Sequence, residues 1–263
     1  MFSKRNILFL IFTFTLTWGC WWSLALLVQK NILSFHSLFG QVLFMIGGSA
    51  PTIAAYFALL KTNGDLKKFH AQVLKIKVHY KWHLFAFFTP FILSAVGTGI
   101  AYLFDNQFLF EHPMQPLYMI LPAFLISIIL GGVEEFGWRG IVQPELSKKH
   151  GYFMINLILG TIWALWHLPL FYIQGVGHYR ESFIIYALGA IAFSSFLTWL
   201  YAKTKSIFLC VVFHASINAS ATLGLGFVKD IVPAYIIHTV FMLMIGTLLL
   251  ILLDKGFQAK NQK

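Results

Sequence analysis

Charged residues are scarce in this sequence. Of its 263 residues only 11% are Asp, Glu, Lys or Arg, whereas 59% are hydrophobic and the mean hydropathy is +0.76. A soluble domain carries about a quarter charged residues. The composition therefore excludes a soluble globule, and a lipid bilayer is the solvent that suits it.

Acidic residues and cysteines are rarer still. Nine Asp and Glu residues stand against 19 Lys and Arg, which gives a formal net charge of +10. The basic residues are scattered between long apolar runs and form no continuous face, so they indicate membrane orientation and anionic lipid, not a nucleic-acid partner. The two cysteines, Cys20 and Cys210, both fall inside apolar runs, which argues against a disulfide scaffold, and we interpret both as packing residues.

Eight segments meet or approach the roughly 20 apolar residues that a helix needs to cross a bilayer. They are residues 7–28, 38–60, 82–104, 117–142, 152–173, 182–202, 207–226 and 231–253. The sequence therefore predicts an all-α, polytopic membrane protein with eight transmembrane helices in a single domain, 1–263. The motifs discussed below lie in a core at about 117–226.

Basic residues set the expected orientation of these helices. If the N-terminus is cytoplasmic, all but three of the 19 Lys and Arg lie in the inner segments, and the exceptions are Lys30, Arg180 and Lys229. This asymmetry predicts both termini in the cytoplasm and a multi-pass protein of the cell membrane. The first span follows Lys4 and Arg5, as in a signal peptide, but it is longer than the apolar region of a typical signal peptide and no small-residue cleavage site follows, so we expect it to be retained.

The segment between the second and third spans has a helical pattern of its own. Leu66, Phe69, Val73 and Ile76 recur at spacings of three, four and three among several lysines. This pattern predicts a helix lying on the inner leaflet. A solvated basic loop is the alternative.

The fourth span contains ionisable residues that the bilayer disfavours. Such groups cost about 2.5 to 3.5 kcal/mol each at the centre of a membrane helix, so their presence needs a local reason. Glu135 and Arg139 are four residues apart and can pair on one helix face, whereas Glu134 points about 100° away from Glu135. The pattern predicts a supporting ion pair next to an available carboxylate.

Two other spans add polar residues, His167 in the fifth and the i, i+4 pair His214 and Asn218 in the seventh. Counting 1.5 Å per residue from the expected inner ends of the spans places Glu134 and His214 roughly 10 to 15 Å deep and His167 about 20 Å deep. Tilted helices, or a break near Pro169, are therefore needed to bring the three residues together. Each residue alone has a structural explanation, such as a hydrogen bond between helices. We interpret His238 in the eighth span in that way.

Water activation is the chemistry that these residues permit together. A carboxyl group removed from water can act as a general base near neutral pH, a neutral His can orient the water, and a second His with an Asn amide can stabilise an oxyanion. Two His and one Glu also form a known zinc set. Zinc bound by His167, His214 and Glu134 therefore stays open as an alternative, although no His-Glu-x-x-His run fixes its geometry.

Three motifs follow one another on successive spans: Glu-Glu-x-x-x-Arg at 134–139, an aromatic-x-x-x-His at 163–167, and His-x-x-x-Asn at 214–218. In this order they resemble the signature of the CAAX-protease and bacteriocin-processing family of intramembrane endopeptidases. That family includes type II CAAX prenyl proteases and lysostaphin-resistance-protein-A-like proteins. Trp163 stands where the second motif often has Phe, which preserves an aromatic wall.

The resemblance implies a membrane-embedded endopeptidase that hydrolyses a peptide, lipopeptide or protein substrate, with or without zinc. It implies Glu134 as the water-activating carboxylate with His167 beside it, and His214 and Asn218 as the metal-binding or oxyanion-stabilising pair. Glu135 and Arg139 match the remaining positions of the first motif. We expect the site to open toward the cytoplasm.

Two alternatives come from other functional classes. A non-catalytic bacteriocin immunity or binding protein would keep the fold, but such a protein has no evident need for a buried Glu134. A proton-coupled transporter would use intramembrane Glu and His as proton relays. Broken helices and an inverted repeat would support it, and the sequence shows no repeat.

Overall fold

The computed structural model describes residues 2–105, 114–225 and 231–261, and within these ranges every regular element is helical. The all-α prediction is therefore confirmed. The elements are α1 (Lys4–Gln29), α2 (Leu38–Lys61), α3 (Leu66–Val73), α4 (Lys81–Phe104), η1 (Leu117–Met119), α6 (Ile120–Leu130), η2 (Gly132–Glu134), α7 (Glu135–Gly137), η3 (Trp138–Val142), α8 (Gln143–Leu146), α9 (Tyr152–Trp166), η4 (Leu168–Tyr172), α10 (Phe183–Thr204), α11 (Ile207–Thr222) and α12 (Val232–Asn261).

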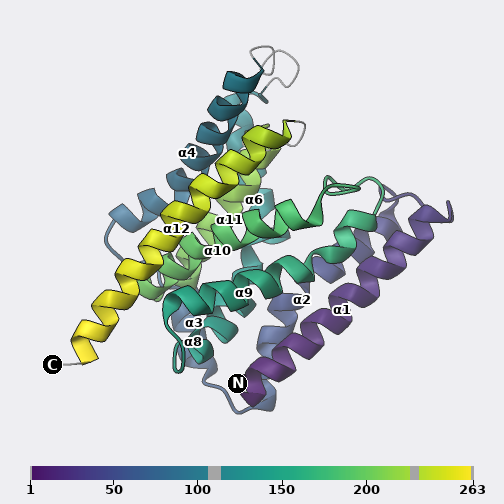
Figure 1. The fold of residues 1–263 in the computed structure, drawn as a ribbon. Coiled ribbons are helices and arrows are strands. Elements are labelled where there is room, and N and C mark those ends of the chain that lie inside the picture. Colours follow the sequence, from purple (N-terminus) through teal and green to yellow (C-terminus); the bar gives the residue numbers. More distant parts are fainter. Residues whose placement is uncertain (1, 106–113, 226–230, 262–263) are drawn as a thin grey trace.

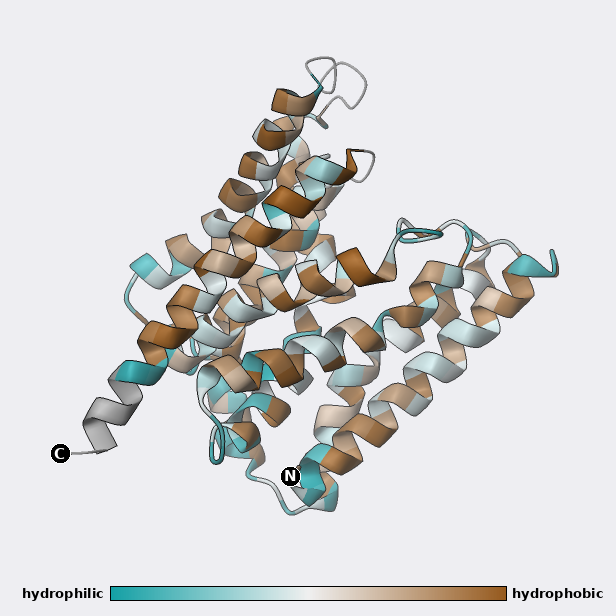
Figure 2. Ribbon diagram, viewed as in Figure 1, coloured by the Kyte–Doolittle hydropathy of each residue, from teal (hydrophilic) through white to brown (hydrophobic). Residues whose placement is uncertain are grey.

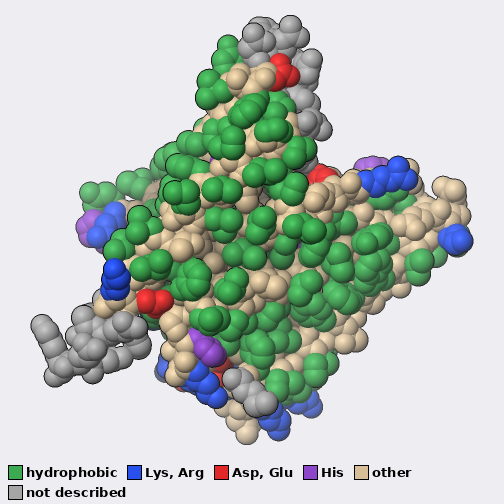
Figure 3. All heavy atoms as spheres, viewed as in Figure 1, with side chains coloured by type: hydrophobic (Ala, Val, Ile, Leu, Met, Phe, Trp, Pro, Cys, Tyr) green, Lys and Arg blue, Asp and Glu red, His purple; other side chains and the backbone are tan. Residues whose placement is uncertain are grey.

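In the described part of the chain, seven helical segments are long and apolar enough to cross a membrane. The remaining predicted span, the seventh at 207–226, corresponds to α11, which is apolar but only 16 residues long. Figure 2 shows that hydrophobic residues, drawn in brown, make up much of α12 and α4. Hydrophobic side chains also cover the middle of the face drawn in Figure 3, while Lys and Arg lie at its margins. These features are those of a multi-pass membrane protein.

The helices pack so that α11 lies inside the bundle. α1 lies along α2, α9 and α12 both pack along α10, and α11 contacts α4 and α6 (Figure 1). Most of the residues of α11 are buried. The helix that carries the third motif is therefore surrounded by protein on most of its sides.

One end of the bundle holds the start of α1, the end of α12 and the helix α3 (Figure 1). Contacts tie its segments together: Arg5 Nε donates to Thr62 Oγ1 (2.9 Å), and Lys75 Nζ donates to the Thr204 carbonyl (2.8 Å). We call it the basic end, because most Lys residues of the described chain lie there. They are Lys4, Lys61, Lys67, Lys68, Lys75, Lys77, Lys81, Lys148, Lys149, Lys203, Lys205 and Lys255.

The opposite end carries the connections α1–α2 and η4–α10, and we call it the loop end. Gln29 Nε2 donates to the Tyr172 carbonyl there (2.8 Å), which joins the two connections. Lys30 and Arg180 are its basic residues in the described chain. Lys229, the third residue predicted on this side, lies outside the described residues.

The amphipathic segment forms the helix α3, as predicted, but the helix ends at Val73 and leaves Ile76 beyond it. Phe69 is buried against the rings of Tyr56 and Phe136 (centroid distances 5.5 and 6.1 Å). The apolar face of α3 therefore packs against the rest of the protein through Phe69.

Candidate active site

The fourth span is broken where its polar residues begin. The α-helix α6 ends at Leu130, and after Gly131 the chain continues through the 3-10 turn η2, the short α7 and the π-helical turn η3. A Cβ built on Gly131 would collide with Asn218 Nδ2, and one on Gly132 would lie 3.0 Å from Val211. The two glycines thus let the irregular backbone approach α11, and Glu134 is placed at the break.

Glu134 is buried and is held by two indole rings. Trp163 Nε1 donates to its Oε2 at 3.0 Å, and Trp138 Nε1 donates to the same oxygen at 3.4 Å. The sequence indicated Trp163 only as an aromatic wall. The indole N–H groups therefore give this carboxylate a fixed position that the sequence analysis missed.

The second glutamate joins two helices. Glu135 Oε2 lies 3.0 Å from Arg139 Nη1, which agrees with the predicted i, i+4 pair, and Glu135 Oε1 lies 2.8 Å from His214 Nδ1. Arg139 Nη2 also donates to Ser194 Oγ on α10 (2.9 Å). All these side chains are buried, so the ion pair anchors His214 as well as the fourth span.

His167 lies at the break of the fifth span. α9 ends at Trp166, and a 3-10 turn containing Pro169 follows, which is the break that the depth difference requires. His167 Nδ1 lies 2.8 Å from the Trp163 carbonyl oxygen. Since a carbonyl only accepts, Nδ1 carries the proton and Nε2 of the neutral ring is an acceptor.

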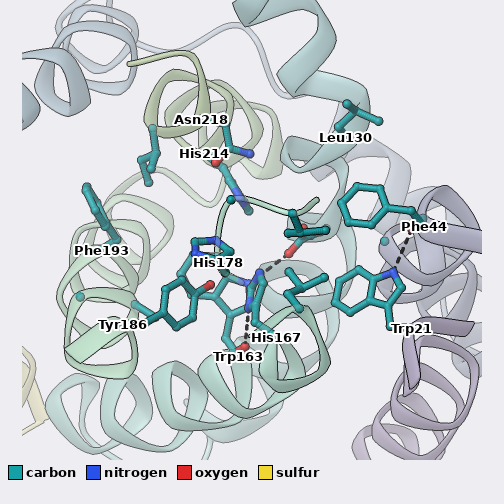
Figure 4. Close-up of a pocket in the computed structure, with 18 of the residues that line it drawn as sticks. Trp21, Phe44, Leu130, Trp163, His167, His178, Tyr186, Phe193, His214 and Asn218 are labelled. Carbon is teal, nitrogen blue, oxygen red and sulfur yellow. Dashed lines mark hydrogen bonds between the residues drawn. The ribbon is translucent and has the colours of Figure 1, made fainter. Parts of the chain in front are cut away.

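One cavity of about 300 Å³ brings the predicted residues together, because Glu134, His167, His214 and Asn218 all line it. Figure 4 shows the two histidines and Asn218 around the same space, with Phe193 on one side and Trp21 and Phe44 on the other. Most of the lining is apolar. Further lining residues include Met45, Leu130, Leu170, Ala190, Ile217 and Met242.

Two side-chain nitrogen atoms lie together on the α11 side of this cavity. Asn218 Nδ2 and His214 Nε2 both face Gly131: the built Cβ collides with the amide and lies 3.2 Å from the imidazole nitrogen. His214 Nδ1 is occupied by Glu135. The amide and the free imidazole nitrogen are therefore the groups available to a ligand.

Two lining residues were missed in the sequence. Tyr186 packs edge-on against His167 (centroid distance 5.4 Å), and His178 contacts Tyr186 (4.8 Å) and lies 3.1 Å from Glu181 Oε2. Both come from the η4–α10 connection or the first turn of α10. The polar run from His178 to Glu181 was the signal that could have found them.

His238 has the structural role that the sequence indicated, since its Nε2 lies 2.8 Å from the Leu93 carbonyl oxygen on α4. Its ring fits against Gly97, where a Cβ would lie 2.9 Å from Nδ1. Cys20 and Cys210 are free cysteines. Cys210 is buried, in agreement with a packing role.

A bound metal ion needs several ligand side chains around one point. Among the described residues, no three His, Cys, Asp or Glu side chains are grouped closely enough to hold a metal ion. Glu134 Oε2 already accepts a hydrogen bond from an indole, and His214 Nδ1 is already hydrogen-bonded to Glu135. Zinc at Glu134, His167 and His214 therefore stays a prediction that this arrangement does not favour.

Part of the cavity lining comes from the loop end. Val176, Gly177 and His178 of the η4–α10 connection line it, whereas segments 61–81, 143–152 and 203–207 of the basic end contribute nothing to its lining. The sequence predicted cytoplasmic termini and a cytoplasmic opening. Both stay predictions.

Known proteins are similar in sequence to this chain. Residues 115–220 match the family model described as type II CAAX prenyl endopeptidase Rce1-like. CAAX prenyl protease 2 of Methanococcus maripaludis is 26% identical over 234 residues, which cover 82% of this chain and 83% of the relative. Lysostaphin resistance protein A is 24% identical over 182 residues in Staphylococcus haemolyticus (68% and 48% covered) and 25% over 191 in Staphylococcus aureus (70% and 44%).

These matches confirm the resemblance drawn from the three motifs, and they support an intramembrane protease. The chain spans about half the length of the lysostaphin resistance proteins that it matches.

Proposed function

We propose that this protein is an intramembrane endopeptidase that hydrolyses a peptide bond with a water molecule activated by Glu134. The observation that carries the proposal is the single cavity lined by Glu134, His167, His214 and Asn218. It combines a proton acceptor with oxyanion donors in an apolar enclosure, where such groups act most strongly.

The acceptor side of the site handles the water. The Glu134 carboxylate, held by Trp163 and Trp138, takes a proton as the water oxygen attacks the peptide carbonyl carbon. The unprotonated Nε2 of His167 accepts the other hydrogen of the water and orients it. The proton on Glu134 then passes to the leaving nitrogen as the carbon–nitrogen bond breaks.

The donor side stabilises the negative charge that develops on the carbonyl oxygen. The Asn218 amide donates to that oxygen, and the His214 ring, anchored through Nδ1 to Glu135, donates from Nε2 when the ring is charged. No step requires a metal ion.

We also propose how the helices are arranged in the membrane. We count α11 as an eighth crossing, shorter than the others and enclosed by them, within one domain that spans 1–263. The basic end then faces the cytoplasm, as the excess of lysines there favours, and the protein resides in the cell membrane. A peptide or lipopeptide is the substrate.

Cleavage of a peptide and lipopeptide library by the purified protein tests the mechanism. Glu134→Gln, His167→Ala and His214→Ala should each lower the rate by about 10² or more, because each removes a proton-transfer group or an oxyanion donor. His36→Ala, an exposed histidine at the loop end, is the matched control and should cleave normally. Undiminished cleavage by all three site variants would overturn the mechanism.

A further inference from the structure

Helix α1 carries a buried hydroxyl group that joins three helices. Thr17 is fully buried, and its Oγ1 donates to the Gly47 carbonyl oxygen on α2 (2.7 Å). The same Oγ1 accepts a hydrogen bond from Trp166 Nε1 at the end of α9, also at 2.7 Å. Thr17 therefore links α1, α2 and α9 at one point, and it fixes the position of the Trp166 ring.

A second hydrogen bond from α1 reaches the backbone of the same tryptophan. Trp18 Nε1 donates to the Trp166 carbonyl oxygen (3.2 Å). The last carbonyl groups of a helix have no partner within that helix, and α9 ends at Trp166. Trp18 thus supplies a donor at this helix end, so α1 contacts both the ring and the backbone of Trp166.

Trp166 directly precedes His167, and the two rings pack edge-on with a centroid distance of 4.6 Å. The ring of Trp166 is fully buried and also packs against Trp21 of α1 (4.8 Å). Because the interior is closely packed, a shift of the Trp166 ring or carbonyl is transmitted to its neighbours. The position of His167 therefore depends on the place that α1 gives to Trp166.

We infer that Thr17 and Trp18 are positioning residues of the site, which hold Trp166 and through it keep His167 in the orientation that water activation needs. The inference rests on the proposed peptidase function. It extends the catalytic machinery to α1, which lies outside residues 115–220, the part that matches the family model. Neither Thr17 nor Trp18 is among the residues that line the cavity, so both act through Trp166.

Two substitutions isolate the hydroxyl group. Thr17→Val keeps the shape of the side chain but leaves the Trp166 indole and the Gly47 carbonyl without this partner, whereas Thr17→Ser keeps both hydrogen bonds. We expect Thr17→Val to lower kcat by about 10- to 100-fold with KM nearly unchanged, because a displacement of about 1 Å far from the chemistry can cost 10²-fold. Thr17→Ser should restore most of the rate.

Thr13→Val is the matched control for Thr17→Val. Thr13 also lies on α1 and is equally buried, but its hydroxyl group has no hydrogen-bond partner among the described residues. This variant should cleave normally. Normal kcat in Thr17→Val, or an equal loss in Thr17→Val and Thr17→Ser, would overturn the inference.

A double-mutant cycle shows whether Thr17 acts through His167. In a His167→Ala background, Thr17→Val should change the residual rate by no more than about twofold, because the group that it positions is absent. The same fold-loss in both backgrounds would show that Thr17 acts independently of His167, and the inference would be rejected.

Trp18→Phe provides a second variant that does not disturb the buried hydroxyl group. It keeps an aromatic ring beside Phe14 but loses the hydrogen bond to the Trp166 carbonyl. We expect kcat to fall by about 2- to 10-fold, the equivalent of one neutral hydrogen bond. Trp22→Phe, whose ring packs against Tyr172, is the control and should leave kcat unchanged. Equal kcat in the two variants would remove Trp18 from the positioning role.

Failure of the peptidase mechanism is distinguishable from failure of this inference. Normal cleavage by His167→Ala would overturn the mechanism and the inference with it. Loss of cleavage in His167→Ala together with normal cleavage in Thr17→Val would overturn the positioning role alone.

Discussion

His214 Nδ1 lies 2.8 Å from Glu135 Oε1, while the other oxygen of the same carboxylate lies 3.0 Å from Arg139 Nη1. One buried carboxylate thus joins an ion pair within the fourth span to a histidine on α11. The contact fixes which nitrogen of His214 faces the cavity. Folding and the orientation of the oxyanion donor therefore depend on the same side chain.

Removal of this carboxylate should destabilise the protein strongly. Glu135→Ala leaves the buried Arg139 without its ionic partner, and breaking a buried pair in this way costs about 3 to 5 kcal/mol. Denaturant unfolding in detergent measures the loss. Lys148→Ala, which removes an exposed partner of Glu145, is the control and should change the free energy of unfolding by less than about 1 kcal/mol. Equal effects of the two substitutions would contradict the anchoring role of Glu135.

Gly131→Ala should abolish most of the activity without unfolding the protein. The new methyl group would displace the Asn218 amide, and loss of one oxyanion donor lowers kcat by about 10² to 10³. Gly99→Ala is the matched control because a Cβ there meets no atom within 4 Å. Steady-state cleavage kinetics compare the two, and normal kcat in Gly131→Ala would show that the close approach to Asn218 has no role in cleavage.

Trp163→Phe tests the indole that holds Glu134. The substitution keeps an aromatic ring but removes the 3.0 Å hydrogen bond, while the longer one from Trp138 stays. A hydrogen bond to a charged group is worth about 1.5 to 3 kcal/mol, so we expect kcat to fall by about tenfold or more. Trp199→Phe, whose ring packs against Trp82, should leave kcat unchanged. The indole would have no catalytic importance if both variants behaved alike.

Removal of metal ions should leave cleavage intact, since the described residues offer no group of three metal-binding side chains. Elemental analysis of protein purified without added metal, and cleavage before and after chelation, provide the measurements. Stoichiometric zinc that is lost in His167→Ala would contradict the metal-free mechanism and select the zinc alternative.

The sequence predicted those helices whose bounds are set by the length of an apolar run. The bounds of α2 and α4 agree with the predicted spans to within one residue. This agreement is expected, because the length of an apolar run must match the thickness of the bilayer. The pairing of Glu135 with Arg139 was also predictable, since it depends only on helical spacing. The three motifs indicated which polar residues share the site.

The remaining features depend on contacts between distant segments. The break at Gly131 arises where the fourth span meets α11, and the bond from Trp163 to Glu134 joins residues 29 positions apart. Part of the cavity lining comes from the η4–α10 connection, whose polar residues carry no helical pattern. Local periodicity contains no information about such contacts.

The division of roles between the two adjacent glutamates has a practical consequence. Glu135 carries the ionic contacts, whereas Glu134 accepts only indole hydrogen bonds in the described structure. An amide oxygen can accept the same bonds, so Glu134→Gln should retain the fold and the cavity while losing the base. Such a variant would act as a substrate trap, and photocrosslinking it in living cells offers a route to the natural peptide.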